Sequence, residues 1–291
     1  MPASAPPAID PHEFIETLLP TVRRCAEASL IFFGQVANMG KAEDSRLGET
    51  RAQTASGVLT ALDNAVQDIV LGAVAARYPQ VALIAEENTP MKRRFAGNKS
   101  EYCLIIDPID GTLHFQKGDA PYHICVGLAK NGRMLASVIA RPDEDKVFTA
   151  VRGGGAYVQV GKRRPRRLRL PKKTKSRQAF VSSKAQAYVE AVGARLQPRD
   201  YPIGAALVLT LIAEGELAAY VTRQVDVYDV GPPSLVAEEA GARCFGRNGQ
   251  ELLYRSRRKL PYYLAAPDED SAAFVLQAVR QSDSQSEGAK K

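Results

Sequence analysis

The sequence has few of the residues that build disulfide frameworks and zinc sites. In 291 residues it contains no tryptophan, three histidines and four cysteines. The cysteines are widely spaced in mostly apolar stretches, and the histidines show no ligand spacing. We therefore expect reduced core cysteines, no zinc site and no disulfide scaffold, as suits a reducing cytosol.

Membrane spans and export signals are also missing from the printed sequence. No uninterrupted apolar run approaches the roughly twenty residues that a membrane-spanning helix needs. The first residues, Met-Pro-Ala-Ser-Ala-Pro-Pro-Ala, have neither the basic region nor the apolar core of an export signal. We expect a cytoplasmic protein without a membrane partner, long enough for one large or two closely packed domains.

Acidic residues are absent from residues 162–177, which contain ten lysines and arginines. Removing these ten charges from the formal net charge of +7 leaves −3, so the basicity comes from one segment. Such a run could bind nucleic acid, an anionic membrane or an anionic substrate. Charge runs usually face solvent, however, and we expect a solvated connector whose Arg-Leu-Arg-Leu stretch forms an edge strand. A nucleic-acid partner is not expected.

The most informative stretch is residues 105–112, Ile-Ile-Asp-Pro-Ile-Asp-Gly-Thr, in which two aspartates follow an apolar run. Pro108 has no N–H, so we expect it to end the strand pairing and leave the Ile109 carbonyl free. Gly111 allows a tight turn, and Thr112 supplies a hydroxyl at the expected start of a helix. These groups suit Mg²⁺ bound together with phosphate, although an Asp-Pro turn with a cap is the alternative.

Three further acids follow or accompany apolar patterns in the first half of the chain. Asp63 is expected near the start of a helix at 58–77, off its main apolar stripe. Glu86 and Glu87 follow a buried-strand pattern at 81–85, and adjacent carboxylates are unfavourable unless they are solvated or neutralised by cations. A solvated acidic turn is the alternative for this pair.

Another acidic position lies far along the chain, before an expected helix at 231–241. Asp229 and Asp226 both compete for it, and either could serve only as a helix N-cap.

In order and spacing, three motifs resemble those of the inositol monophosphatase-like, lithium-sensitive, Mg²⁺-dependent phosphatases. They are Ile-Ala-Glu-Glu at 84–87, the stretch at 105–112, and Tyr-Asp-Val-Gly at 228–231. Val-Arg-Gly-Gly-Gly-Ala-Tyr at 151–157 also resembles that family's glycine-rich hairpin, so the resemblance covers roughly residues 12–270. It implies a mixed α/β fold: a layered α-β-α-β-α sandwich of the inositol monophosphatase and fructose-1,6-bisphosphatase type.

The resemblance also implies two or three Mg²⁺ ions that activate water for direct attack on a phosphate monoester. Carried across residue by residue, the implied metal ligands are Glu86, Asp107, the Ile109 carbonyl, Asp110, Asp229 and, for a weaker third ion, Glu87 with Asp63. Thr112, held by Asp63, matches the hydroxyl that polarises the attacking water. The Gly111 and Thr112 amides match the phosphate cradle, so the implied catalytic residues are Thr112, Asp63 and Glu87.

The substrate contacts depart from this pattern. Thr222 stands where many inositol-specific relatives carry a glutamate, and Ala205 follows Gly204 in the expected substrate loop where a hydroxyl residue is common. We therefore expect a small phosphorylated metabolite such as a sugar, inositol or polyol phosphate. The alternatives are a 3′(2′),5′-bisphosphate nucleotide, histidinol phosphate or fructose 1,6-bisphosphate and, from another class, a non-catalytic anion or nucleic-acid binder acting through 162–177.

The chain divides into four expected regions, and the resemblance implies a homodimer. The ends at 1–10 and 282–291 are expected to be disordered, between them an α+β domain spans 11–175, and an α/β domain with Asp229 and the substrate loop spans 176–281. Helices are expected at 12–35, 58–77, 204–215, 231–241 and 268–280, and strands at 81–85, 102–107, 122–130, 134–141, 146–151 and 217–222.

Overall fold

A computed structural model describes residues 8–35, 51–199, 203–255 and 259–288. The helices in these ranges are α1 (Pro11–Ser29), α3 (Arg51–Arg77), α4 (Thr112–Lys117), α5 (Val189–Gly193), α6 (Ala205–Glu214), α7 (Val227–Ala240) and α8 (Glu269–Gly288). Short 3₁₀ helices lie at η1 (Met91–Phe95), η2 (Pro142–Glu144) and η3 (Ser183–Tyr188).

The first sheet has seven strands in the order of the sequence. They are β1 (Ala82–Ala85), β2 (Tyr102–Asp110), β3 (His123–Lys130), β4 (Arg133–Arg141), β5 (Lys146–Val151), β6 (Gly155–Val160) and β7 (Arg166–Leu168). Only the β1–β2 pair is parallel. The other neighbouring pairs are antiparallel, as expected for consecutive strands joined by short connections. The predicted edge strand of the basic segment is confirmed, because β7 closes this sheet.

The second sheet has five strands in the order β11-β12-β10-β8-β9. They are β8 (Gln178–Val181), β9 (Gln197–Arg199), β10 (Ala219–Val225), β11 (Arg243–Phe245) and β12 (Leu260–Ala266). Strands β9, β8 and β10 are parallel, and β12 runs antiparallel to β10 and β11. Helix α6 lies in the connection that precedes β10, as crossovers between parallel strands require.

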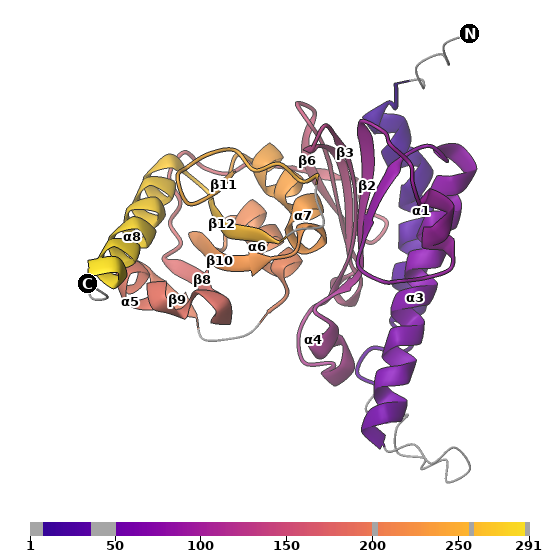
Figure 1. Ribbon diagram of the computed structural model, residues 1–291, viewed down its shortest axis with the longest axis horizontal. Coiled ribbons are helices and arrows are strands. Elements are labelled where there is room, and N and C mark those ends of the chain that lie inside the picture. Colours follow the sequence, from indigo (N-terminus) through magenta and orange to yellow (C-terminus); the bar gives the residue numbers. More distant parts are fainter. Residues whose placement is uncertain (1–7, 36–50, 200–202, 256–258, 289–291) are drawn as a thin grey trace.

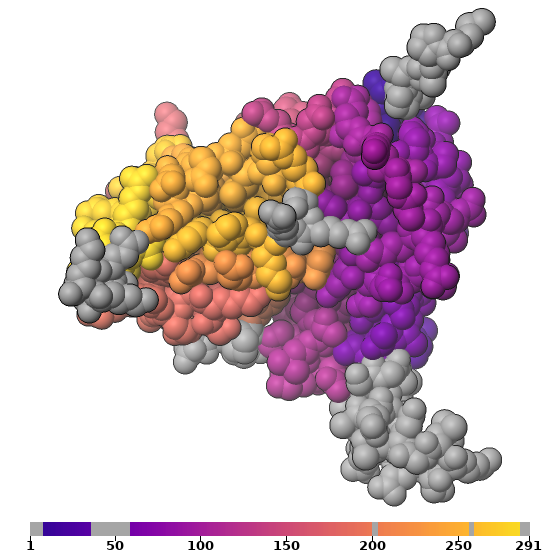
Figure 2. Space-filling model, viewed as in Figure 1, coloured from indigo at the N-terminus to yellow at the C-terminus, as the bar shows by residue number. Residues whose placement is uncertain are grey.

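The elements form five layers, as predicted (Figure 1). Helices α1 and α3 cover one face of the first sheet, α6 and α7 lie between the two sheets, and α5 and α8 cover the outer face of the second sheet. Each of the two outer interfaces has its own apolar core, and a larger core fills the middle. The two halves therefore share the central helices, and Figure 2 shows them in broad contact.

Helix α3 contains a stretch, Leu59–Arg77, that is long and apolar enough to cross a membrane by length and hydropathy alone. About a third of this stretch is buried, and core helices pass the same test. Val66, Val70 and Val74 pack in the core beneath the first sheet. Asp63 and Asp68 lie within this stretch, so it is not an uninterrupted apolar run.

Two predicted helix boundaries in the first part of the chain differ from the structure. The helix expected at 12–35 ends at Ser29 and continues as turns, while the helix expected from 58 begins at Arg51. Asp63 therefore lies deep inside α3 and is buried, not near a helix start.

The helix expected at 231–241 begins earlier, at Val227, so that Pro232 and Pro233 lie inside it and Asp229 lies in its first turn.

The strand at the central motif was also predicted too short. Strand β2 continues past Pro108 to Asp110, which pairs with His123. A register shift between Asp107 and Asp110 accommodates the proline, since a bulge leaves one residue out of the ladder and needs no N–H there. The aspartates thus lie on a strand end held by its neighbour.

Parts of both ends belong to structural elements where the structure describes them, and the disorder expected at 1–10 and 282–291 stays a prediction. Ile9 is buried, Asp10 caps α1, and α8 extends through 282–288. Residues 1–7 and 289–291 lie outside the described residues. The boundary predicted at 175/176 falls between β7 and β8, which belong to different sheets, and the division into two domains stays a prediction. All four cysteines are free, and three of them are buried.

Candidate functional site

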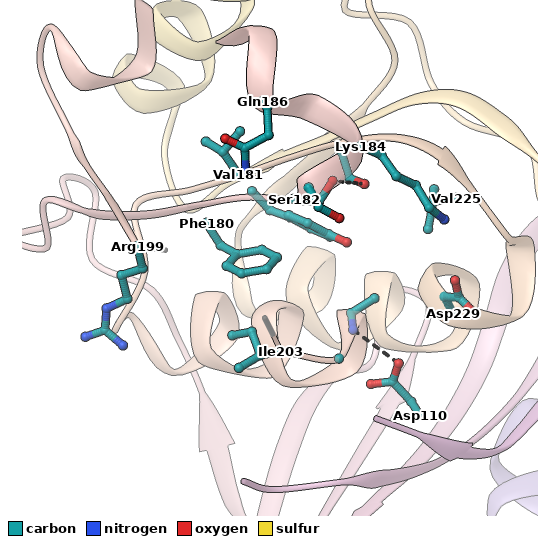
Figure 3. A pocket seen from close by; sticks show the side chains of 15 residues that line it. Asp110, Phe180, Val181, Ser182, Lys184, Gln186, Arg199, Ile203, Val225 and Asp229 are labelled. Atoms are coloured by element: carbon teal, nitrogen blue, oxygen red, sulfur yellow. Dashed lines mark hydrogen bonds between the residues drawn. The ribbon is translucent and has the colours of Figure 1, made fainter. Parts of the chain in front are cut away.

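The candidate site lies where the end of β2 meets the starts of α6 and α7. A pocket of about 480 Å³ opens here and is lined by Asp110 and Asp229 at one end. Figure 3 shows these two carboxylates on one side and Arg199 at the opposite end. The other walls come from β8, η3 and β10 of the second sheet.

Asp107 is the most deeply buried acid of the site. It is 2% exposed, and its Oδ1 accepts a hydrogen bond from the Ile109 amide at 3.1 Å. Burial raises the pKa of Asp107 well above its usual range, and the negative charges of Glu86, Asp110 and Asp229 raise it further. Its side chain also shares a hydrogen bond with Glu86. Two carboxylates that share one hydrogen bond form a site with excess negative charge.

Glu86 directly follows β1 and is exposed at the surface in part. Partial burial raises the pKa of this carboxyl and the charge of Glu87 adds to the rise, while the hydrogen bond with Asp107 and the charge of Lys92 oppose it. Lys92 donates hydrogen bonds to the carbonyls of Ala85 and Glu87, at 2.8 and 2.5 Å. The lysine therefore fixes the turn that carries both glutamates.

Asp110 is tied to the second half of the chain. Its carboxylate accepts hydrogen bonds from the amides of Ala205 and Ala206, at 3.1 and 2.9 Å, and so caps α6 from 95 residues away (Figure 3). Burial raises the pKa of Asp110 to about 7, although both amides lower it. Residue 204 must be glycine for the Asp110 carboxylate to lie this close to the start of α6, because a Cβ there would collide with it.

Asp63 faces the same region from α3. It is 5% exposed, and its Oδ1 has no hydrogen-bond partner among the described residues. Burial raises the pKa of Asp63 to about 8, with the charges of Glu86 and Glu87 adding to the effect. A buried carboxylate oxygen without a partner is costly, so this one marks a place where a ligand, water or proton fits.

Gln67, one helical turn after Asp63, holds the backbone of Glu87. Its amide donates to the Glu87 carbonyl and accepts from the Glu87 N–H, both at 3.0 Å. Together with Lys92, it fixes the backbone at Glu87, whose side chain is half-buried.

Two expectations about the turn after β2 were wrong. The Ile109 carbonyl is not free, because it accepts a hydrogen bond from the Thr112 hydroxyl at 3.0 Å. Within the described residues, the Thr112 hydroxyl donates to this carbonyl and not to Asp63. Gly111 adopts φ 92°, a left-handed conformation that favours glycine, at the start of α4. Thr112 is the first residue of that helix, as predicted.

The structure separates the two competing aspartates. Asp229 lines the pocket, and burial raises its pKa to about 8, with Asp110 and Asp226 adding to the rise and Lys184 opposing it. Asp226 is the N-cap residue of α7 and forms an ion pair with Lys259 at 2.9 Å. Asp229 is therefore the acid that faces Asp110.

These carboxylates fit a hard divalent cation by their chemistry. No three His, Cys, Asp or Glu side chains in the described ranges converge closely enough to form a ready metal cluster. The pKa values of Asp63, Asp107, Asp110 and Asp229 are nevertheless all raised by burial and by neighbouring carboxylates, so these acids need bound protons or cations to balance their charge. Carboxylate and carbonyl oxygens are the ligands that Mg²⁺ takes in proteins.

The wall contributed by the second sheet and η3 is hydroxyl-rich and has no acidic side chain among its described lining residues. Ser182 and Thr222 share a hydrogen bond of 2.7 Å (Figure 3). Lys184 donates to the Gln224 carbonyl at 3.2 Å. Ser182 lines the pocket together with Ser183. Ala205 and Gly204 line it as predicted for a substrate loop.

A second, smaller cavity of about 240 Å³ adjoins the first. The two share Phe180, Arg199 and Ile203, and the rest of the second lining is mostly apolar, including Leu207 and Leu211. The space next to the carboxylates is thus polar, and the space farther from them is apolar.

The basic segment does not contribute to this pocket. Within the described part of the chain, the lining includes no residue of 162–177, and most of these side chains are exposed. The cations at the pocket are Lys184 and Arg199, which the sequence did not single out. Lys184 directly follows Ser182 and Ser183 at the end of an apolar strand pattern, and this position was the only sequence feature that could have drawn attention to it. No sequence feature distinguished Arg199.

Comparison with known proteins identifies the family. A model described as the inositol monophosphatase family matches residues 16–284. The chain is 26% identical over 216 residues to the Nus factor SuhB of Pasteurella multocida, covering 69% of this chain and 76% of that protein. It is 24% identical over 260 residues to inositol monophosphatase 2 of Mus musculus, with 85% and 86% covered.

A solved inositol monophosphatase structure from Zymomonas mobilis has a TM-score of 0.73 at 15% identity and covers 94% of this chain and 100% of that one. This likeness shows the same fold. The family model spans most of the sequence, and the chain therefore belongs to the inositol monophosphatase family.

Proposed function

We propose that the protein is a Mg²⁺-dependent hydrolase of phosphate monoesters that uses water as the nucleophile. The observation that carries this proposal is the accumulation of buried carboxylates with raised pKa values beside an open pocket. Uncompensated acids repel phosphate, so a binder of anions alone has no use for them unless cations intervene. Membership of the inositol monophosphatase family supports the same reaction class.

The residues that would hold two or three Mg²⁺ ions are those implied by the sequence: Glu86, Glu87, Asp107, the Ile109 carbonyl, Asp110 and Asp229, with Asp63 nearby. Bound Mg²⁺ supplies Lewis-acid stabilisation of phosphoryl oxygens and lowers the pKa of water. The Ile109 carbonyl has a second lone pair beside the one that accepts the Thr112 hydroxyl, so both interactions are compatible.

The chain's own groups would orient the reaction. Thr112 Oγ1 donates to the Ile109 carbonyl, which leaves its lone pairs available to accept a hydrogen bond from water. In the metal-free protein a pKa of about 8 keeps Asp63 mostly protonated near neutral pH; once cation binding has ionised this carboxyl, its buried Oδ1, which has no partner among the described residues, would accept a hydrogen bond from that water. The amides of Gly111 and Thr112 at the start of α4 would donate to phosphoryl oxygens.

The preferred substrate class is a small sugar, inositol or polyol phosphate. The hydroxyl pair of Ser182 and Thr222 and the amino group of Lys184 can bind a hydroxylated leaving group next to Asp229. Relatives named as inositol monophosphatases support this class, whereas those named as Nus factors suggest that a further role can accompany it.

A bisphosphorylated nucleotide is the second candidate, and the adjoining apolar cavity favours it. A base could pack against Phe180 and Ile203, and Arg199 at the junction could bind a second phosphate.

A substrate panel tests the proposal. EDTA-treated protein should release no phosphate from inositol 1-phosphate, fructose 1,6-bisphosphate, histidinol phosphate or adenosine 3′,5′-bisphosphate, and added Mg²⁺ should restore release from at least one. Li⁺ should inhibit that release. Asp110→Asn should lower it by about a thousandfold, because it removes a charged metal ligand and leaves only one oxygen to accept from the α6 amides. The exposed Asp270→Asn serves as the matched control. Equal activity of Asp110→Asn and wild type would refute the metal assignment.

A further inference from the structure

Four charged or polar residues form a row across neighbouring strands of the first sheet. Asp110 on β2 pairs with His123 on β3, and Arg141 on β4 pairs with Lys146 on β5. The β3–β4 register, with Ile124 opposite Ala140, brings His123 level with Arg141. Directly opposed residues share one face of a sheet, so the row forms one line beginning at the candidate site.

Helix α6 presents a matching line of residues to this row. Ala206, Thr210 and Glu214 follow at intervals of four, which places them on one helix face. The Ala206 amide binds Asp110 at 2.9 Å, Thr210 accepts a hydrogen bond from Arg141 at 2.5 Å, and Glu214 forms ion pairs with Lys146 at 3.3 Å and Arg141 at 3.4 Å. The helix is therefore fixed along its length, and its first turn is held by Asp110.

Arg141 is the centre of this arrangement. It is 1% exposed, and its Nε donates to His123 Nε2 at 3.1 Å while its Nη1 lies 3.2 Å from Glu144. A buried guanidinium is costly unless its donors are satisfied, so its position is fixed by its partners. Thr210, itself fully buried, accepts a hydrogen bond from one of these donors and donates its own hydroxyl to the Ala206 carbonyl at 2.9 Å.

We propose that Arg141 and Thr210 are positioning residues that hold the first turn of α6 on the Asp110 carboxylate and so set the shape of the substrate loop. The inference deepens the proposed function and rests on it for its kinetic arm. Two bonded links, Arg141 to Thr210 and Thr210 to Ala206, join a buried cation on β4 to a residue whose amide touches the candidate site.

A merely structural role makes a different prediction. If the row only stabilises the contact between the halves, removing the Thr210 hydroxyl lowers overall stability and leaves the first turn of α6 unchanged in the folded protein. If the row positions that turn, the amides bound to Asp110 become less protected and the substrate binds more weakly.

The test compares Thr210→Val, which is nearly isosteric but lacks the hydroxyl, with Thr210→Ser, which retains it. Ser29→Ala removes another fully buried hydroxyl, one at the end of α1 that bonds Ala26 and Tyr122 and has no bond to α6, and is the matched control. Hydrogen exchange in the peptide spanning 203–210 is measured by mass spectrometry. KM and kcat are measured on the best substrate of the panel with saturating Mg²⁺.

We expect Thr210→Val to speed exchange in this peptide about tenfold and to raise KM about tenfold with kcat changed less than about threefold. Thr210→Ser should restore both values, and Ser29→Ala should alter neither. Exchange and KM equal to wild type in a folded Thr210→Val protein would overturn the proposal.

If Thr210→Val does not fold, Arg141→Lys takes its place. A lysine keeps the positive charge beside Glu144 and Glu214 but cannot donate to His123 and Thr210 together. Unchanged exchange in that variant also overturns the proposal. If the wild type hydrolyses no phosphate ester, the proposed function fails, whereas the exchange measurement still decides whether the row positions α6.

Discussion

Around the pocket, the residues from the first sheet and those from the second differ in charge and burial. The first sheet and α3 supply Asp63, Asp107 and Asp110, all buried and all with raised pKa values. The second sheet supplies the hydroxyls of Ser182 and Thr222 and, farther away, an apolar cavity. Asp229 at the start of α7 is the acid that the central layer adds.

The difference separates reaction from substrate choice. Buried like charges are unfavourable by themselves, so their arrangement is explained only by something they bind. Hydroxyls and apolar side chains carry no such conflict, and they can change without disturbing the carboxylates. We therefore expect substitutions on the first side to abolish the reaction and substitutions on the second to redirect it.

The largest effect is expected for Asp107→Asn. Activity should fall by about a thousandfold, because the acid at the centre of the cluster can no longer bind a cation. The metal-free variant should nevertheless be more stable than the metal-free wild type at about pH 8, since the ionised Asp107 opposes folding when its pKa is raised. Melting curves with EDTA and with Mg²⁺ check both parts. A variant less stable than wild type in EDTA would contradict the electrostatic account.

A smaller effect is expected at the start of α7, where two aspartates can be compared directly. Asp229→Asn should lower kcat/KM about a hundredfold. Asp226→Asn should lower it less than about threefold, because it loses only a partly exposed ion pair with Lys259. Steady-state kinetics on one substrate distinguish them, and the reverse order would assign the distal ligand to Asp226.

The pH dependence of stability should reveal the same carboxylates. In the folded protein Asp63 and Asp229 have pKa values of about 8 and Asp110 of about 7, against an ordinary value of 3.8. The folded state therefore binds more protons than the unfolded state, and stability falls as pH rises from about 4 through 8. His123 acts oppositely below about pH 6.5, because burial lowers its pKa.

Urea midpoints of the EDTA-treated protein should thus be lower at about pH 8.5 than at about pH 6, and saturating Mg²⁺ should shrink the difference. Midpoints that rise with pH in EDTA would show that the carboxylates are neutralised by other means.

The smallest effect on the reaction is expected at Thr222, on the second side. Thr222→Val should change kcat on a generic aryl phosphate less than about threefold but should raise KM for a hydroxylated substrate by about fivefold, since it removes one hydrogen-bonding group. Thr222→Ser is the control. Equal losses on both substrates would place Thr222 in the reaction itself and weaken the separation of the two sides.

Much of the architecture could be predicted from sequence because the relevant signals are local. Strands that end in acids, as at Asp107 and Glu86, bring carboxylates to one end of neighbouring strands, and β1 and β2 are indeed adjacent and parallel. The predicted end of the strand at Pro108 was wrong, because proline interrupts a regular ladder but is compatible with a bulge. The pairing of Asp110 with His123 also depends on the partner strand β3. The early start of α7 had a similar cause, since its core packing outweighs two prolines.

The remaining features depend on contacts between distant residues. The hydrogen bond from the Ala205 amide in the first turn of α6 to Asp110 joins residues 95 positions apart, and no local sequence pattern predicts it. In the sequence, Gln67 is only a polar residue within an apolar helical pattern. Its two hydrogen bonds to the Glu87 backbone depend on the packing of α3 against the residues that follow β1 and cannot be inferred from local sequence. Side-chain partners of this kind follow from tertiary structure.

Calorimetric titration of Mg²⁺ into the EDTA-treated protein near neutral pH tests the central claim most directly. The account predicts binding accompanied by proton release, seen as a heat that varies with the buffer's ionisation enthalpy, because Asp63, Asp110 and Asp229 lose protons when a cation binds. Asp107→Asn should abolish most of both signals. Absence of Mg²⁺ binding at millimolar concentration, or binding that Asp107→Asn leaves intact, would contradict it.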